Sequence, residues 1–476
     1  MGRKPLYQSI YNRLRYQILS GEWQIGSVLP PERKLAEELG VSRNTIVRAY
    51  NDLEAEALIA SKMGSGRYVQ SLAPASSIPS IDWQEQLHHS EQLHSYPSHM
   101  AEVLSISCGI SSSINFTHGD GGKHTIAALD FPRYFAQAAA NPEAYYFEPI
   151  AGHTPLREWI VSWMNMEQVS SIEQIVVTSG SQEALHLITS LLAKPGDKIA
   201  VEMPTYFGAL QLFQSRGIHI IPIPMDRDGM RTDVLQGVLT RYRPKFIYTV
   251  PTYHNPTGYT LSLARRKKLL QLSETYKIPI IEDDAYRHLH LHQEPPPALK
   301  ALDTSGNVIY INTFSKILFP GLRLGWIAAS RPFTQLCSRL KELSITTNTF
   351  GQRSLYAFLQ EGKLPDHLAR VRGMYLKQSE TMGMHLARLK ELGVAFEKPE
   401  GGFYYWVSLP ENVDVREVLR ECMSHGVTFA CGDMFLPREA IQPYLRLCYA
   451  HESCEAIQAG MDILANVLRK RKELSS

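Results

Sequence analysis

Cysteine is scarce in this sequence, and long hydrophobic runs are missing. Six cysteines occur among 476 residues, and none has the Cys-x-x-Cys spacing of zinc or redox motifs. Scattered thiols favour a reducing compartment and argue against a disulfide framework. No apolar stretch approaches the length that spans a membrane, and the basic N-terminus lacks the hydrophobic core of a signal peptide. We therefore expect a cytoplasmic protein without a membrane partner.

The chain also lacks a strong excess of either charge, because its formal net charge is only +2. The distribution is nevertheless uneven. Residues 1–70 hold ten Lys and Arg against seven Asp and Glu, a balance of +3, whereas residues 71–125 hold one lysine against five acids, a balance of −4. A mildly basic head is compatible with nucleic-acid contact without requiring it. A chain of this length favours two or more domains.

Residues 5–70 predict three helices and a hairpin. The first two helices are amphipathic and end at Gly21 and Gly40, and Ser42 is a natural N-cap for the third. Two helices joined by a tight glycine turn make a helix-turn-helix. Apolar segments on both sides of residues 63–66 predict a β-hairpin, the wing. The other reading is a small helical domain with a solvated basic face.

The detailed string favours the DNA-binding reading. It runs Leu29-Pro-x-Glu32-Arg33-x-Leu35-Ala36, Leu39-Gly40-Val41-Ser42-Arg43-x-Thr45, Ala49-Tyr50-x-x-Leu53 and Gly64-Ser65-Gly66-x-Tyr68-Val69. This string closely resembles the GntR-type winged helix. The resemblance implies a winged helix-turn-helix domain (α+β) over residues 1–70 that binds double-stranded operator DNA. By it, the residues that approach DNA are Arg33, Ser42, Arg43, Thr45, Arg48 and Gly66.

Residues 71–125 are rich in Ser, Pro, His and Gln, which predicts a linker. Its histidines at 88, 89, 94 and 99 could be read as a metal cluster. Histidines in a polar linker are more often simply solvated, and we predict no metal site.

From Phe131 onward, expected strands and helices alternate, which predicts a largely parallel sheet in an α/β domain. The apolar run Val308–Ile311 reads as a buried strand that delivers Lys316 into a loop. A lysine there is a candidate Schiff-base amine if its surroundings lower its pKa. Glu282-Asp283-Asp284 ends another strand, at the edge where open α/β sheets bind ligands.

A pyridoxal phosphate enzyme needs a lysine, a carboxylate for the pyridine nitrogen, donors to the phenolic oxygen, an aromatic face and a phosphate cup. Residues of all five kinds occur in the sequence. In that order they are Lys316, Asp283, Asn255 with Tyr286, Tyr206, and Gly180-Ser181-Gln182.

These motifs, with Pro204-Thr-Tyr206, His254-Asn255-Pro-Thr-Gly258 and Pro320-Gly-Leu-Arg323-x-Gly325, resemble fold-type I aminotransferases of the aminoadipate and kynurenine branch. The resemblance covers about residues 125–470. It implies an α/β PLP-dependent transferase large domain over 126–335 and a smaller α+β lobe over 336–476. It also implies phosphate contacts from Thr313, Ser315 and Arg323, and a bidentate grip by Arg446 on a substrate α-carboxylate. We favour Asp283 over Asp284, because the family's carboxylate precedes the tyrosine by three residues.

A GntR head joined to such a domain resembles the MocR-type transcriptional regulators. The resemblance implies a homodimer whose large domain senses an amino acid or related amine through an external aldimine. The alternatives are an active aminotransferase with a DNA-binding head and a repressor whose cofactor is purely structural. One departure concerns the tyrosine that reaches the neighbouring subunit in that family. Its motif is spaced differently around Tyr146, which leaves that role open.

Overall fold

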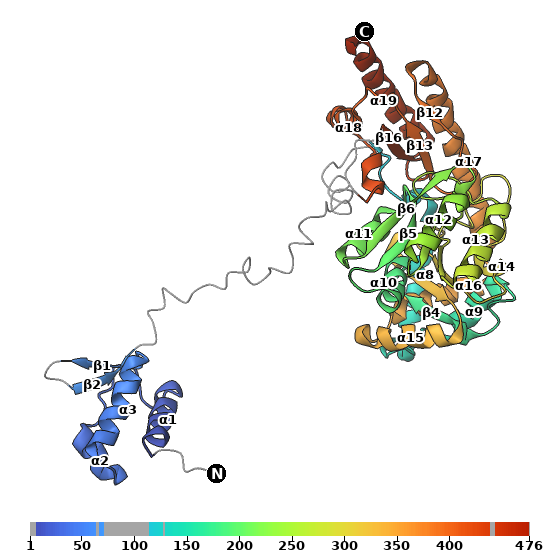
Figure 1. The fold of residues 1–476 in the computed structure, drawn as a ribbon. Helices are drawn as coiled ribbons and strands as arrows, with labels where there is room; N and C mark the ends of the chain where they lie inside the picture. The colour runs from blue at the N-terminus through green and yellow to red at the C-terminus, as the bar shows by residue number, and fades with distance from the viewer. Residues whose placement is uncertain (1–5, 63–65, 71–113, 127–128, 438–442, 476) are drawn as a thin grey trace. The chain divides into compact units, whose positions relative to one another are not determined.

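The computed structural model describes residues 6–62, 66–70, 114–126, 129–437 and 443–475. The chain forms two compact units, Met1–Glu91 and Gln92–Ser476, which Figure 1 draws in blue and in cyan to red. The tip of the expected wing, the four linker histidines and most of the expected linker lie outside the described residues.

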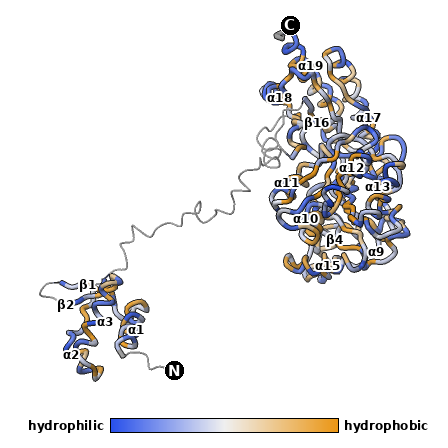
Figure 2. The backbone as a smooth tube through the Cα atoms, in the orientation of Figure 1, coloured by the Kyte–Doolittle hydropathy of each residue, from blue (hydrophilic) through white to orange (hydrophobic). Residues whose placement is uncertain are grey.

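The first unit is a winged helix, as the sequence predicts. Its elements are α1 (Leu6–Leu19), α2 (Glu32–Leu39), α3 (Arg43–Ala55) and the antiparallel strands β1 (Ile59–Lys62) and β2 (Gly66–Val69). Apolar residues at helical spacing form its core, among them Leu14 of α1 and the fully buried Ile46 and Leu53 of α3. Figure 2 shows hydrophobic and hydrophilic residues following one another along these helices, the pattern of elements that bury one face.

The second unit is organised around an eight-stranded sheet with the order β4-β11-β10-β9-β8-β5-β6-β7. The strands are β4 (Ile175–Thr178), β5 (Lys198–Met203), β6 (His219–Asp226), β7 (Gly229–Met230), β8 (Ile247–Thr249), β9 (Ile280–Asp283), β10 (Val308–Thr313) and β11 (Gly325–Ala328). Neighbouring strands from β10 to β6 pair in parallel, whereas β11 is antiparallel to both β10 and β4. The prediction of a largely parallel sheet is therefore confirmed.

Both faces of this sheet are buried, and the side chains alternate between two hydrophobic clusters. Ile280 and Val308 belong to one cluster, whereas their neighbours Ile281 and Ile309 belong to the other. This alternation follows from the period of two of a β-strand. Helices cover both faces, and they are α8 (Phe131–Ala139), α9 (Thr154–Met164), α10 (Ser181–Leu192), α11 (Phe207–Ser215), α12 (Thr232–Tyr242), α13 (Leu263–Tyr276) and α14 (Leu299–Leu302).

The C-terminal part begins with the helices α15 (Arg331–Lys341), α16 (Thr349–Gln360) and α17 (Leu364–Arg388). A four-stranded sheet follows, with the order β12-β13-β16-β15. Its strands are β12 (Ala395–Phe396), β13 (Tyr404–Ser408), β15 (Ala430–Cys431) and β16 (Tyr444–Cys448), and the last helices are α18 (Val415–Ser424) and α19 (Cys454–Ser475). This is the smaller α+β lobe that the sequence predicts. None of the helices among the described residues is both long and apolar enough to cross a bilayer.

The start of the second unit differs from the expected linker limit of residue 125. Strand β3 (Ile114–Asn115) pairs in parallel with β14 (Val427–Thr428) of the small lobe. Phe116 and Thr117 are buried next to it, and a short helix α7 spans Lys123–Ile126. These buried residues make the segment part of the fold of the second unit, which the polar composition of residues 71–125 does not indicate.

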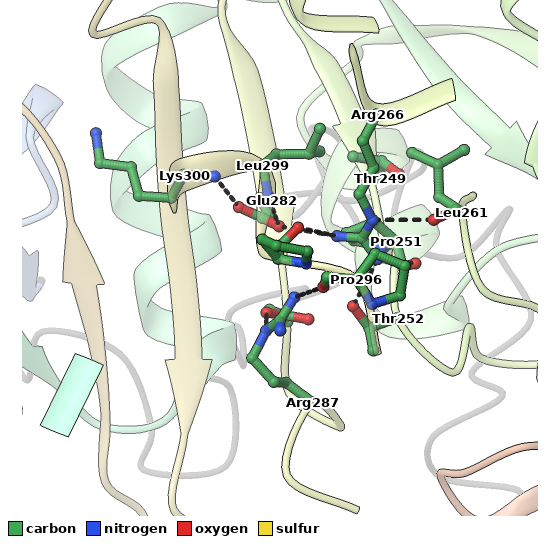
Figure 3. Close-up of polar contacts among 12 residues, drawn as sticks. Thr249, Pro251, Thr252, Leu261, Arg266, Glu282, Arg287, Pro296, Leu299 and Lys300 are labelled. Atoms are coloured by element: carbon green, nitrogen blue, oxygen red, sulfur yellow. Dashed lines mark hydrogen bonds and ion pairs between the residues drawn. The ribbon is translucent and has the colours of Figure 1, made fainter. Parts of the chain in front are cut away.

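A buried polar network stabilises the loops under the carboxyl edge of the large sheet (Figure 3). Glu282 accepts hydrogen bonds from the backbone N–H groups of Leu299 and Lys300, both at 2.7 Å. Its carboxylate lies 3.7 Å from the guanidinium of Arg266, and neither side chain is exposed. Arg266 also donates to the backbone carbonyls of Leu261 and Pro251 at 2.9 and 2.8 Å. One arginine therefore ties both ends of the loop between β8 and α13 to the end of β9.

We predict that Arg266→Met lowers the free energy of unfolding by about 3–5 kcal/mol, because it leaves a buried carboxylate without its cation. The control is the neighbouring Arg265→Met. Arg265 pairs with Asp226, whose side chain is 41% exposed, so its loss should cost about 1 kcal/mol or less. Denaturant unfolding of the full chain, followed by fluorescence, measures both. Equal effects of the two substitutions would contradict this account.

Candidate functional site

A cavity of about 500 Å³ opens at the carboxyl edge of the large sheet. Because β11 is antiparallel to both of its neighbours, β4 runs in the same direction as β10. The strands β4, β10, β9, β8 and β5 therefore all end at this edge, where α/β sheets bind ligands. The lining residues that the sequence predicts are Ser181, Gln182, Tyr206, Asn255, Asp283, Tyr286, Thr313, Ser315, Lys316, Arg323 and Arg446.

Lys316 lies in the turn between β10 and β11 and is half-buried. Its Nζ donates a hydrogen bond to the backbone carbonyl of Gly119 at 2.6 Å. Burial lowers the pKa of Lys316, and the carboxylate of Asp120 partly opposes this shift. A lowered pKa increases the fraction of neutral amine, which is the nucleophilic form.

Asp283 and Asp284 are adjacent but face different surroundings. Tyr248 donates to Oδ2 of Asp283 at 3.0 Å, while the buried Oδ1 has no hydrogen-bond partner. Burial raises the pKa of Asp283 to about 6, against the hydrogen bond from Tyr248. Asp284 instead pairs with Arg287. Burial alone would raise the pKa of Asp284, but Arg287 and Arg266 lower it overall. Of the two carboxylates, only Asp283 lines the cavity.

Three hydroxyl and amide groups meet on another side of the cavity. Asn255 Nδ2 donates to the Tyr286 hydroxyl at 3.4 Å, and that hydroxyl lies 3.1 Å from the hydroxyl of Tyr404. Tyr206, at the N-terminus of α11, lines the cavity, and burial raises the pKa of its phenol to about 12. These groups therefore remain neutral hydrogen-bonding partners at physiological pH.

An anion cradle lies where β4 meets α10. Gly180 has a φ of +84°, and a Cβ built on it would lie 2.9 Å from Nη2 of Arg323. The backbone N–H groups of Ser181 and Gln182 lie in the first turn of α10, where helical N–H groups lack an intrahelical partner. Ser315, whose hydroxyl lies 3.1 Å from that of Thr313, lines the same cavity. Glycine at 180 thus lets the guanidinium approach the helix start.

Arg446 lies in β16 and is 1% exposed. Nη1 donates to Oδ1 of Asn255 at 2.8 Å, and Nη2 donates to the carbonyl of Thr117 at 2.6 Å. Its guanidinium lies 4.2 Å from the centre of the Tyr404 ring. The buried Nε has no hydrogen-bond partner, and none of the ion pairs found between described residues involves Arg446. A buried guanidinium held only by neutral groups is suited to an anionic ligand.

The sequence did not identify the segment Thr117–Asp120, which lines the cavity next to Lys316. A Cβ on Gly119 would lie 2.6 Å from the hydroxyl of Tyr404, so this glycine permits a close approach. Tyr404 was also missed. The run Gly119-Asp120-Gly121-Gly122 was the one available signal, since consecutive glycines often mark a close approach of the backbone to another group.

The residues of this cavity fit pyridoxal 5'-phosphate. Four residues that line it have a buried polar atom without a hydrogen-bond partner, and these atoms are Oδ1 of Asp283, Oε1 of Gln182, Nε of Arg446 and Oγ1 of Thr117. Buried polar groups are normally satisfied, so their free positions indicate a polar ligand. A carboxylate suits the pyridine nitrogen, and the Gly180 cradle suits the phosphate. Tyr146, which is 75% exposed, lies outside this cavity.

The predicted DNA-binding residues lie on the surface of the first unit. Ser42 caps α3 by accepting a hydrogen bond from the N–H of Thr45 at 3.3 Å. Arg33, Arg43, Arg48 and Gly66 are exposed. The guanidinium of Arg48 already lies 4.0 Å from the centre of the Tyr7 ring. Among the residues that the structure describes, the ion-pair contact of Arg43 is a long one of 3.8 Å to Glu32, which leaves its guanidinium available for a partner.

Comparison with known proteins agrees with this description. Aminotransferases of class I and II match residues 113–464, and bacterial regulatory proteins of the gntR family match residues 6–69. The uncharacterized HTH-type transcriptional regulator YdfD of Bacillus subtilis is 29% identical, with 100% of this chain and 98% of the relative covered. Aromatic-amino-acid aminotransferase 1 of Thermococcus litoralis is 34% identical, with 78% of this chain and 89% of the relative covered.

A solved structure shares the fold of the second unit. The α-aminoadipate aminotransferase LysN of Thermus thermophilus, complexed with N-(5'-phosphopyridoxyl)-L-leucine, matches with a TM-score of 0.77 and 28% identity, covering 83% of this chain and 100% of its own. The expected fold-type I architecture is therefore confirmed. The chain belongs to the aminotransferase class I and II family and carries a gntR-type winged helix at its N-terminus, the MocR-type combination.

Proposed function

We propose that the protein is a cytoplasmic, homodimeric, DNA-binding transcriptional regulator that senses an amino acid or related amine with pyridoxal 5'-phosphate. Residues 1–70 would read operator DNA, residues 126–335 would hold the cofactor, and residues 336–476 would contribute Arg446. One observation carries the proposal. The same chain holds an exposed recognition-helix terminus around Arg43 and a cavity in which neither Lys316 nor Arg446 forms an ion pair with a described residue.

Bound pyridoxal phosphate supplies an aldehyde for amino groups and a ring that accepts electrons. Lys316 would present its amine to that aldehyde, and its lowered pKa favours the neutral form. The free oxygen of Asp283 would hold a proton at the pyridine nitrogen. Asn255 and Tyr286 would donate hydrogen bonds to the phenolic oxygen, and Arg323 with the start of α10 would bind the phosphate. Arg446 would orient the carboxylate of an amino acid.

The homodimer rests on an exposed apolar surface. Tyr145, Tyr146 and Phe147 are consecutive and 66%, 75% and 78% exposed. Three neighbouring aromatic side chains in water are costly, and such patches usually mark an interface. We propose that a second copy covers them, with Tyr146 reaching toward the partner's cavity.

A second candidate is an aminotransferase with a DNA-binding head. The cavity holds a lysine, a carboxylate and an arginine in places that suit that chemistry, and Lys316 could move the proton at the substrate Cα. The similarity to an aromatic-amino-acid aminotransferase points the same way. Keto-acid formation, measured beside operator binding, separates the two functions.

We predict that Lys316→Ala abolishes the visible absorbance of the cofactor-loaded protein, because no other lysine lines the cavity among the described residues. The exposed Lys267→Ala is the control and should retain full absorbance. Absorbance spectra of the purified variants after incubation with pyridoxal phosphate decide the point. An unchanged visible band in Lys316→Ala would remove the lysine assignment.

We predict that Arg43→Ala weakens operator binding by about 1–3 kcal/mol, the worth of a base-reading contact, and leaves the cofactor absorbance unchanged. Affinity for DNA should also fall with salt. Arg15→Ala is the matched control, because Arg15 pairs with Glu56 beyond the opposite end of α3. Fluorescence anisotropy with labelled operator measures both variants. Wild-type protein that binds random DNA as tightly as operator would argue against the regulator.

We predict that Arg446→Ala retains cofactor and operator binding but loses the response of operator binding to the effector, because a carboxylate loses its bidentate partner. Arg446→Lys should be impaired as well, since an ammonium lacks the planar fork. Arg420→Ala, an exposed substitution on α18, serves as control. Operator binding is titrated with effector, and melting temperatures verify folding. A wild-type response in Arg446→Ala would place carboxylate recognition elsewhere in the cavity.

A further inference from the structure

Four of the five Asp, Lys and Arg side chains that line the cavity have a role in the proposed function. Arg323 is assigned to the phosphate, Lys316 to the aldehyde, Asp283 to the pyridine nitrogen and Arg446 to an α-carboxylate. The remaining charged group in the lining is Asp120. A carboxylate in a ligand cavity that neither cofactor nor α-carboxylate can use indicates a feature of the ligand itself.

Asp120 is held in place by one histidine and lies near a second. Oδ1 accepts a hydrogen bond from Nδ1 of His451 at 2.7 Å. Oδ2 lies 3.8 Å from Nδ1 of His118, which is too long for a hydrogen bond. The two imidazole rings stack with their centres 4.3 Å apart. One carboxylate oxygen is therefore fixed and the other is available to a ligand.

The position of His451 links this cluster to the α-carboxylate site. His451 follows the end of β16, the strand that carries Arg446. Asp120 follows Gly119, whose carbonyl accepts the hydrogen bond of Lys316. The contact for the α-carboxylate and the histidine that orients Asp120 therefore lie in one short segment, and Asp120 itself adjoins the glycine that contacts Lys316.

Asp120 keeps its negative charge at neutral pH. Burial alone would raise the pKa of Asp120, but the hydrogen bond from His451 and the nearby positive charge of Lys316 lower it overall. No lysine or arginine among the described residues forms an ion pair with it, and its ion-pair contacts there are to His118 and His451. Its side chain is 20% exposed, so a ligand can reach it.

A metal ion is the competing occupant, since the donors of His118, Asp120 and His451 lie within 4.8 Å of one another. Metal ligands direct their lone pairs at one point. The two rings are only 21° from parallel, so their nitrogen lone pairs do not converge. The arrangement fits an oriented carboxylate better than a metal centre.

We propose that Asp120 binds a positively charged distal group, so that the effector is a diamino acid or an amino acid with a guanidino group. The inference rests on the proposed function and specifies its ligand class. An ammonium or guanidinium N–H would donate to Oδ2 of Asp120, while Arg446 holds the α-carboxylate. Lysine, ornithine and arginine are members of this class.

The test is a titration of the cofactor-loaded full chain with amino acids, followed by the change in visible absorbance. Lysine and norleucine form a matched pair, because their side chains differ by the terminal ammonium. Wild-type protein should bind lysine roughly ten- to a hundredfold more tightly than norleucine, the range of a charge-assisted hydrogen bond. The ligand 2-aminoadipate, with an acidic side chain, should bind most weakly.

The variant Asp120→Asn should bind lysine and norleucine about equally and leave the norleucine affinity near that of the wild type. Asp120→Lys should reverse the preference toward 2-aminoadipate. Asp228→Asn, an exposed substitution in the turn between β6 and β7, is the control and should keep the preference for lysine. Melting temperatures and the absorbance before titration verify that each variant is folded and loaded.

Different failures have different meanings. Equal wild-type affinity for lysine and norleucine would overturn the role of Asp120 and leave the sensor proposal intact. Zn²⁺ binding that is lost in Asp120→Asn, together with no preference for lysine, would assign the cluster to a metal and also overturn it. If no amino acid or related amine of any class changes the spectrum, the sensor proposal itself is wrong, and this inference is wrong with it.

Discussion

The site depends on the direction of a few strands in one sheet. Strand β11 runs against both β10 and β4, so that β4 returns to the direction of the parallel strands. The start of α10, the turn that carries Lys316, and Asp283 at the end of β9 therefore meet at one edge. A parallel β11 would place the glycine cradle of α10 at the opposite edge from the lysine.

The cavity contains charged and polar atoms that are buried but have no hydrogen-bond partner. Asp283 has a free carboxylate oxygen, and Arg446 a free Nε, at positions hidden from water. Each such group destabilises the empty protein, because its hydration is lost without a replacement. By contrast, Glu282, the residue before Asp283, has its carboxylate satisfied by two backbone N–H groups and lies 3.7 Å from Arg266.

Much of this arrangement could be predicted from the sequence, because it rests on apolar runs that end in polar motifs. The strand before Lys316 and the strand before Asp283 are short and fully buried, and both were recognisable. The segment around Gly119 was not, since a glycine-rich polar stretch carries no periodicity. Its position is set by contacts with Tyr404 and Arg446, which are distant in sequence. Arg48 was correctly placed on α3, but its contact with Tyr7 of α1 depends on tertiary packing.

The two cations of the cavity are both anchored to one short piece of backbone. Lys316 donates to the carbonyl of Gly119, and Arg446 donates to the carbonyl of Thr117. A molecule that accepted both of these hydrogen bonds would remove them from the carbonyls of Thr117 and Gly119. In the sequence, residues 71–113 connect this segment of backbone to the winged helix. A ligand that engages both Lys316 and Arg446 would therefore act on hydrogen bonds of the segment that leads to the N-terminal unit.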